Sequence, residues 1–292
     1  MARRSLLRNH AEAALVRALL ALFRRAPRTA LTAFRLVDRL LPRLRQVANR
    51  NLDLALAGTP PTEIVDGCFE SLARVVAMMA SFPDIDKSNV HNLIRYEGFE
   101  HFEAAKRAGK GVLFATAHLG NWEFSAFAHA LMAEPMSFVV RPLDNPILDE
   151  IASCYRTLSG NKLIGRGKDF LRPLLEALRR NEAVGILIDQ NVTADRGIFI
   201  DFFGRPACVD SAFARLAART GAAVIPGYAL WSEDESRYIL HFDPPVEMTG
   251  DVQADTQAIH ARLESAIRQN PAQWLWIHRR WKTRPPGEPP LY

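Results

Sequence analysis

From about residue 89 onward, the apolar positions of the chain alternate between strand-like runs and helical spacing. Short apolar runs predict strands near residues 91–96, 112–117, 137–140, 183–189, 222–229 and 237–242. Amphipathic spacing between them predicts helices near residues 99–108, 146–158, 169–180, 211–220 and 253–269. Because strands alternating with helices of this length are joined by crossovers, we expect an α/β fold with a mixed, largely parallel central sheet flanked by helices.

The first third of the chain has helical spacing throughout. Pro27 interrupts a first helix and can start a second, and the turn residues 58–61 precede a helix over 62–81. A stripe of arginines at spacings of seven and four lies beside an apolar side made of Leu15, Ala18, Leu19, Leu22 and Phe23; the stripe is Arg17, Arg24, Arg28, Arg35 and Arg39. We therefore expect a helical attachment segment over residues 1–58 and one α/β domain over residues 59–292.

Charge is concentrated in the same segment. Residues 1–50 hold twelve arginines and two acidic residues, a net charge of +10, whereas the remainder carries −5. An Arg-rich amphipathic helix of this kind is typical of a segment lying on an anionic membrane surface, where each basic group contributes about 1 kcal/mol. The alternative is a solvated helix packed on its own domain. The segment matches no nucleic-acid-binding module, so we expect no nucleic-acid partner.

Other sequence features indicate where in the cell the protein resides. Arg17 interrupts the best apolar run, so the sequence has no stretch of 18 uninterrupted apolar residues and we expect no spanning helix. It also lacks an apolar segment followed by a cleavage site, so we expect no signal peptide. Cys68, Cys154 and Cys208 are isolated, which argues against a disulfide framework or a zinc site and favours buried, reduced thiols. We expect a protein on the cytoplasmic side, attached to the inner face of a membrane.

His118 and Glu123 are the candidate catalytic residues. On a continuous helix, residues five apart diverge by roughly 140°, so the two side chains meet only if His118 precedes the helix and Glu123 lies in its first turn. Gly120 permits the turn after the apolar strand, and Asn121 is a preferred N-cap.

A histidine oriented by a carboxylate can take the proton of a hydroxyl that attacks an acyl carbonyl. The backbone N–H groups of the Gly120-Asn121 turn could receive the developing oxyanion. The alternative is a structural turn, in which His118 caps a backbone group and Glu123 favours the helix N-terminus. Neither a Gly-x-Ser-x-Gly nor a His-Glu-x-x-His motif is present, and no metal is expected.

Several ordered blocks over residues 48–292 resemble one family, the bacterial lipid A biosynthesis acyltransferases, which act late in lipopolysaccharide assembly. The blocks are GKGV at 109–112, HLGNWE at 118–123, VRPLDNP at 140–146, RGKD at 166–169, IDQ at 188–190, GIFIDFFG at 197–204 and WLWIHRRWKTRP at 274–285. The resemblance implies a fold like that of glycerolipid acyltransferases. It also implies an inner-membrane enzyme that transfers a fatty acyl group from acyl carrier protein to a hydroxyl of a lipid A precursor, without a cofactor.

In this reading His118 is the general base and Glu123 its orienting partner, while Gly120 and Asn121 contact the substrate. Arg141 and Arg166 suit phosphate or oxyanion contacts, and their alternative is a surface salt bridge.

Asp189 ends a strand at the same sheet edge as His118 and is expected to order Arg166 or the substrate, with a loop or N-cap role as its alternative. Phe199, Phe202 and Phe203 line an acyl channel or belong to the core. Residues 274–281 form either a headgroup-level aromatic belt or a final core strand.

Two other functions remain open. One is O-acylation of another membrane glycolipid or phospholipid, such as the phosphatidylinositol mannosides on which some family members act. A glycerolipid acyltransferase would more typically have His-x4-Asp, and Glu123 counts against it. The other, from a different class, is a non-catalytic lipid-binding membrane protein that has kept the fold.

Overall fold

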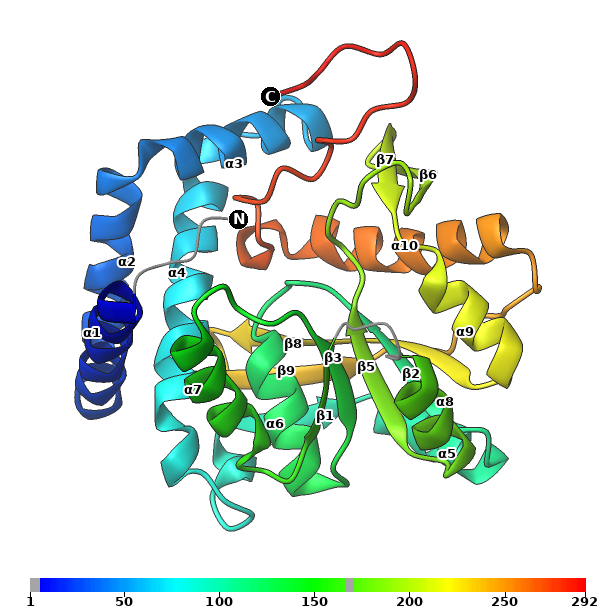
Figure 1. Ribbon diagram of the computed structural model, residues 1–292, viewed down its shortest axis with the longest axis horizontal. Helices are drawn as coiled ribbons and strands as arrows, with labels where there is room; N and C mark the ends of the chain where they lie inside the picture. The colour runs from blue at the N-terminus through cyan, green and yellow to red at the C-terminus, as the bar shows by residue number, and fades with distance from the viewer. Residues whose placement is uncertain (1–5, 166–170) are drawn as a thin grey trace.

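The computed structural model describes residues 6–165 and 171–292. Its N-terminal third is helical, as the spacing predicts. The helices are α1 (Leu6–Arg25), α2 (Arg28–Leu40), α3 (Pro42–Ala55) and α4 (Pro61–Ser81). Helices α1, α2 and α4 lie along one side of the molecule and α3 runs across its top (Figure 1). Two short 3-10 turns, at Phe82–Asp84 and Val90–Asn92, lead from α4 into the sheet.

The central sheet has seven strands in the order β1-β9-β8-β2-β5-β3-β4. Their bounds are β1 Ile94–Glu97, β2 Val112–Thr116, β3 Ser137–Val140, β4 Lys162–Gly165, β5 Ala183–Leu187, β8 Ala223–Ser232 and β9 Arg237–Phe242. Only the β8–β9 pair is antiparallel, and every other neighbouring pair is parallel. The predicted mixed, largely parallel sheet is therefore confirmed.

Helices cover both faces of this sheet. Phe114 packs with α5 (Phe99–Ala108) and α6 (Trp122–Met132), and α7 (Pro146–Thr157) lies beside α6. Leu113 and Ala115 point to the other face, towards α8 (Leu171–Arg179), α9 (Ala212–Thr220) and α10 (Val252–Gln269). This alternation is the period of two that a strand buried on both sides requires.

The sequence analysis predicted neither β4 nor the hairpin of β6 (Ile198–Phe202) and β7 (Arg205–Val209). Strand β4 is a four-residue edge strand that pairs with β3, too short for a clear pattern. The hairpin turns at Phe203 and Gly204, both with positive φ (58° and 72°). Since a phenylalanine rarely adopts positive φ, the dipeptide lacks the usual hairpin signal.

Helix α1 is docked on the α/β body by its inner side. Leu20 and Phe23 pack with Ala73 and Ala80 of α4, and the side-chain amide of Asn145 donates to the carbonyl of Asn9 at 3.1 Å. The predicted membrane attachment of this segment is not decided by this packing. None of the helices in the described ranges is long and apolar enough to span a bilayer. Of the cysteines expected to be buried, Cys68 and Cys208 are buried and Cys154 is exposed.

The C-terminal aromatic block is part of the core. Trp274, Trp276 and Trp281 are at most 3% exposed, so they do not form a headgroup-level belt. The block follows a 3-10 turn (Pro271–Gln273) and runs as turns and bends, so it is not the predicted strand either. Phe202 and Phe203 pack against these tryptophans, which makes them core residues and not part of an acyl channel.

Candidate active site

The ends of two neighbouring parallel strands bring His118 and Asp189 together. Strands β2 and β5 pair in register, with Thr116 opposite Leu187. The backbone N–H of Ile188 then donates to the carbonyl of Thr116 at 3.0 Å, so the two chains stay adjacent beyond the strands. Ligand sites of open α/β sheets gather at such carboxyl ends, and the sequence analysis placed both residues at this edge.

The Asp189 carboxylate, and not that of Glu123, is the hydrogen-bond partner that orients His118. Its Oδ1 lies 2.8 Å from Nδ1 of His118, and its Oδ2 accepts from the backbone N–H of His118 at 2.9 Å. The indole Nε1 of Trp274 donates to the same Oδ2 at 2.9 Å. Asp189 therefore orders His118; its predicted contact with Arg166 involves a residue outside the described ranges and stays a prediction.

The surroundings of Asp189 keep it ionised although it is only 3% exposed. Burial alone would raise the pKa of this carboxyl, but the charge and hydrogen bonds of His118 and the hydrogen bond from Trp274 hold it well below its usual range. An ionised carboxylate at Nδ1 requires the proton on that nitrogen. The neutral imidazole of His118 therefore carries its lone pair on Nε2.

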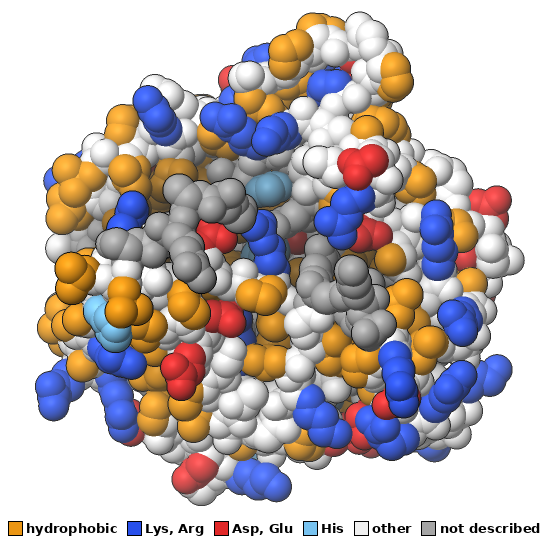
Figure 2. Space-filling model, viewed as in Figure 1, with side chains coloured by type: hydrophobic (Ala, Val, Ile, Leu, Met, Phe, Trp, Pro, Cys, Tyr) orange, Lys and Arg blue, Asp and Glu red, His pale blue; other side chains and the backbone are white. Residues whose placement is uncertain are grey.

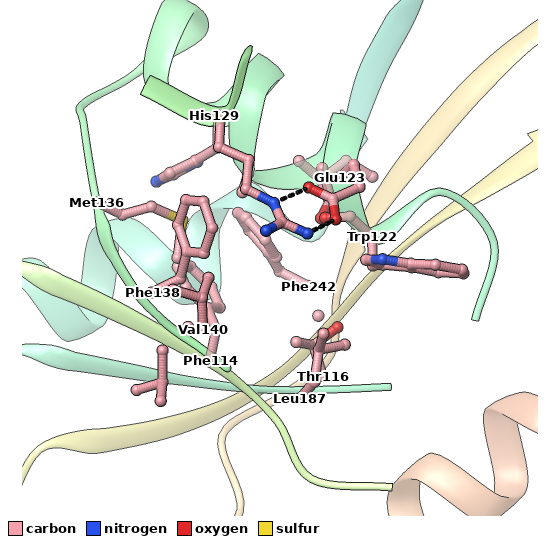
Figure 3. A pocket seen from close by; sticks show the side chains of 17 residues that line it. Phe114, Thr116, Trp122, Glu123, His129, Met136, Phe138, Val140, Leu187 and Phe242 are labelled. Carbon is pink, nitrogen blue, oxygen red and sulfur yellow. Dashed lines mark hydrogen bonds and ion pairs between the residues drawn. The ribbon is translucent and has the colours of Figure 1, made fainter. Parts of the chain in front are cut away.

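Glu123 makes a different pair. Its carboxylate accepts from Nε of Arg156 at 2.9 Å and from Nη2 at 2.5 Å, a two-point contact between α6 and α7 (Figure 3). Both side chains are mostly buried, with 11% of Glu123 and 21% of Arg156 exposed. Burial lowers the pKa of Arg156, but the bonds from Glu123 outweigh it and the net change is a rise. In the first turn of α6, Glu123 is thus directed to α7.

The turn between His118 and α6 is held by the protein itself. Gly120 has φ 61°, and a Cβ there would lie 1.9 Å from the carbonyl oxygen of Ala229. The N–H of Gly120 donates to the carbonyl of Gln273 at 2.9 Å, and that of Asn121 to the carbonyl of Ala229 at 2.8 Å. These donors are therefore occupied and do not form the expected oxyanion site.

Asn121 has the predicted N-cap role. Its side-chain oxygen accepts from the N–H of Phe124 at 3.0 Å, and its amide nitrogen donates to the hydroxyl of Tyr238 at 3.1 Å. The residue is fully buried. Gly120 and Asn121 thus shape the turn, and the expected substrate contact of both residues is corrected to a structural role.

Of the two predicted arginines, Arg141 lies within the described residues and Arg166 does not. Arg141 directly follows β3, at the carboxyl edge of the sheet, and is exposed; its predicted contact with a phosphate or oxyanion stays a prediction. The predicted role of Arg166 also stays a prediction.

An apolar pocket opens beside this edge, between the sheet and helices α6 and α7. Trp122 lines the pocket (Figure 3), and its ring lies 5.0 Å from the imidazole of His118, so His118 is adjacent to a pocket residue. The pocket lining is mostly aromatic and aliphatic and includes Phe114, Thr116, Met136, Phe138, Val140, Gly185, Leu187, Gly227 and Phe242. This shape and polarity suit a long apolar ligand.

His129 lies two turns along α6 from Trp122 and lines the same pocket. It is 1% exposed, its Nδ1 is 2.7 Å from the hydroxyl of Tyr96, and burial lowers its pKa to about 3. A neutral imidazole among phenylalanines adds no charge to the pocket. His129 therefore serves as part of the apolar wall.

Three residues that contact the predicted site residues were not predicted to belong to the site. Arg156 and Gln190 gave no recognised signal, although Gln190 directly follows Asp189 in the IDQ block. Trp274 begins the C-terminal block, but the indole contact with Asp189 spans 85 positions. In the described part of the chain, no group of three or more His, Cys, Asp or Glu side chains is arranged to hold a metal ion.

A histidine whose ring is oriented by a buried carboxylate, next to a tryptophan that lines an apolar pocket, is an arrangement that can serve general-base chemistry. A search against family models identifies the class further. Residues 4–283 match the bacterial lipid A biosynthesis acyltransferase family, and the chain belongs to it. The protein is therefore an acyltransferase.

Curated relatives agree with this family. A lipid A biosynthesis palmitoleoyltransferase of Escherichia coli is 31% identical over 263 residues, covering 86% of this chain and 83% of the relative. A lipid A biosynthesis acyltransferase of Haemophilus influenzae is 25% identical over 228 residues, or 77% and 71% of the two chains. A phosphatidylinositol mannoside acyltransferase of Mycobacterium tuberculosis is 28% identical over 234 residues, or 77% and 73%.

The buried histidines predict how stability depends on pH. Burial lowers the pKa of His129 to about 3 and that of His260 to about 4, below the unfolded value of about 6.5. As the pH falls, the unfolded chain binds these protons first, so their stabilisation is present above about pH 6.5 and is lost towards pH 4. We expect urea unfolding to show this loss, with His129 alone accounting for about 2 kcal/mol between about pH 7.5 and pH 5.

The test compares this pH difference in wild type, His129→Gln and the exposed control His10→Gln. His129→Gln is expected to shrink the difference, whatever its effect at a single pH, and His10→Gln to keep it. An unchanged difference in His129→Gln would show that folding does not lower the pKa of His129.

Proposed function

We propose that the protein transfers a fatty acyl group from acyl carrier protein to a hydroxyl of a lipid A precursor, at the cytoplasmic face of the inner membrane. The observation that carries this proposal is the pairing of His118 with the buried Asp189, next to Trp122, which lines the apolar pocket. The lipid A biosynthesis relatives support the acceptor class. The thioester donor is itself activated for transfer, so the proposed reaction uses no cofactor.

His118 is the general base in this reaction. Its Nε2 takes the proton of the acceptor hydroxyl while that oxygen attacks the thioester carbonyl carbon. Asp189 accepts the hydrogen bond from Nδ1, holds this tautomer and stabilises the imidazolium that forms. The tetrahedral intermediate then breaks its C–S bond, and the departing carrier thiolate takes the proton from the imidazolium.

The acyl chain of the donor occupies the pocket between the sheet and α6. Its lining of aromatic and aliphatic side chains removes the chain from water, which is worth about 0.8 kcal/mol for each buried methylene. Trp122 contacts both His118 and this pocket, so the carbonyl end of a bound chain lies beside the base.

Glu123 acts through Arg156 in this proposal. Both residues line the pocket, and their two-point pair places a fixed guanidinium in its wall. A positive group held there favours the negative charge that develops on the thioester oxygen. This role replaces direct pairing between His118 and Glu123.

O-acylation of another glycolipid is the second candidate, favoured by the mycobacterial relative, a phosphatidylinositol mannoside acyltransferase. The same base and pocket serve either acceptor, because both reactions join an acyl group to a hydroxyl. Offering both acceptors to the purified protein separates the two candidates.

The catalytic prediction compares two carboxylates. Mass spectrometry of a tetra-acylated, Kdo-bearing lipid A precursor, incubated with acyl carrier protein thioesters, should show one added acyl group for wild type and none for His118→Ala. Asp189→Asn removes the carboxylate that fixes the tautomer and should lower kcat by roughly 10³-fold to 10⁴-fold. Glu123→Gln should lower kcat by roughly 10-fold to 100-fold, because one hydrogen bond to Arg156 can remain.

The matched control is Asp234→Asn, a carboxylate in the exposed turn between β8 and β9, which should retain wild-type rates. An equal loss in Glu123→Gln and Asp189→Asn would contradict the assigned partner of His118. Transfer only to phosphatidylinositol mannoside would select the second candidate, and binding of lipid without any transfer would favour a non-catalytic protein.

The pocket predicts a residue that sets acyl chain length. The φ of Gly185 is not positive, so its backbone does not require glycine, yet an added Cβ would lie 2.7 Å from Cε of Met136. Gly185→Ala should therefore shorten the preferred acyl chain, with kcat/KM for the longest wild-type thioester falling roughly 10-fold for two excluded methylenes. The measurement is a competition among carrier thioesters of graded length.

Gly165→Ala is the control, since a Cβ at this position on β4 meets nothing within 4 Å. It should keep the wild-type preference. The same preference in Gly185→Ala would show that the acyl chain does not reach this part of the pocket.

We further propose that α1 and α2 attach the protein to the membrane. Leu7, Leu15 and Leu22 are spaced to share one face of α1 and are 83%, 61% and 46% exposed. The arginine stripe is exposed as well, although Arg24 also pairs with Asp84. Figure 2 shows apolar side chains over the side of the molecule where α1 lies, with basic side chains among them. This combination suits an anionic lipid surface.

Vesicle sedimentation tests this attachment. Binding to anionic vesicles should fall as salt rises, because the Debye length shrinks from about 10 Å at 0.1 M to about 3 Å at 1 M. Replacing Arg17, Arg28 and Arg35 by Gln should remove most of the salt-dependent part, and Leu15→Ser with Leu22→Ser the remainder. Equal binding to neutral and anionic vesicles at all salt concentrations would contradict an electrostatic contribution.

A further inference from the structure

Gln190 faces the proposed base from the side opposite Asp189. It directly follows Asp189 beyond β5, its side chain is exposed, and its Nε2 lies 3.4 Å from Nε2 of His118. Two consecutive residues thus contact the two ring nitrogens of one histidine. The proposed mechanism uses Asp189 and leaves Gln190 without a role.

The donor and acceptor groups of the two side chains set the direction of this hydrogen bond. Because Asp189 accepts the proton of Nδ1, Nε2 of the neutral imidazole is an acceptor. The amide nitrogen of Gln190 is a donor, so its N–H covers the lone pair that would take the acceptor's proton. A hydroxyl bound for catalysis needs the same position. Gln190 and the acceptor hydroxyl therefore compete for Nε2.

We infer that Gln190 is a gate that keeps His118 covered until the acceptor hydroxyl displaces it, and so suppresses hydrolysis of the donor thioester. This inference rests on the proposed function, since it takes His118 as the base. Without a cover, water could lose a proton to Nε2 while its oxygen attacks the thioester carbonyl. The C–S bond would then break, the carrier thiolate would take the proton from the imidazolium, and a free fatty acid would be released.

The strength of the contact suits such a gate. At 3.4 Å the hydrogen bond is longer than the usual range, and the side chain is exposed, so little holds it in place. An acceptor lipid is bound by its own contacts, which present its hydroxyl to Nε2 at a high effective concentration. A single water molecule has no such additional contacts. The acceptor can therefore displace the amide more readily than water.

A substitution of Gln190 should disturb the structure of the site less than a substitution of Asp189. Asp189 is buried and accepts three hydrogen bonds, so its loss disturbs the site itself. Gln190 is exposed, and its removal leaves these bonds in place. Gln190→Ala removes both the bulk and the donor, whereas Gln190→Glu keeps the size but replaces the donor by a carboxylate that cannot donate when ionised.

The experiment measures two products from the same carrier thioester with the full-length protein. Free fatty acid reports hydrolysis without acceptor, and acylated lipid A precursor reports transfer with acceptor. The ratio of hydrolysis to transfer should rise about 10-fold in Gln190→Ala, whereas Gln190→Glu should slow both reactions, because its carboxylate favours the protonated imidazolium of His118. Gln269→Ala, an exposed residue at the end of α10, is the matched control and should keep the wild-type ratio.

The double variant Gln190→Ala with His118→Ala identifies the route of the extra hydrolysis. It should lose that hydrolysis, because water is then without its base. An unchanged ratio in Gln190→Ala, or hydrolysis that persists in the double variant, would overturn the gate. If His118→Ala alone retains acyl transfer, the proposed function fails instead, so the two failures are distinguishable.

Discussion

The site depends on the hydrogen bonds that the buried carboxylate of Asp189 accepts. This carboxylate accepts hydrogen bonds from the backbone and ring of His118 and from the indole of Trp274, so it ties together the ends of β2 and β5 and the C-terminal block. A charge with 3% exposure is stable only with such compensation. The same bonds that satisfy the charge also fix the tautomer of His118.

The two faces of the sheet differ in how they are packed around this carboxylate. On one face, the tryptophans and Phe202 and Phe203 form a dense core that holds the indole of Trp274 in place. On the other face, α6 and α7 leave an apolar pocket lined by sheet residues such as Phe114 and Gly185. The packed core thus lies on one side of the carboxylate and the apolar pocket on the other face of the sheet.

Much of the fold could be predicted because its patterns are local. The helix at Phe99–Ala108 and the strands at Ser137–Val140 and Arg237–Phe242 have the predicted bounds, since apolar period and flanking turn residues agree there. The β6–β7 hairpin could not be predicted, because its turn uses Phe203 at positive φ and its strands pack by contacts with distant tryptophans. The C-terminal block was ambiguous for a related reason: aromatic composition does not distinguish a core from a surface belt.

The sequence by itself determined that His118 ends a buried strand, that Gly120 turns the chain, that Asn121 caps α6, and that Asp189 reaches the same sheet edge. Each of these depends on a neighbouring residue or on strand order. Only the tertiary structure decided which carboxylate binds His118. Glu123, five positions away, is turned by the helix towards Arg156, whereas Asp189, 71 positions away, is brought within 2.8 Å by the parallel register of β2 and β5. Sequence distance does not measure proximity when a sheet aligns strands that the chain separates.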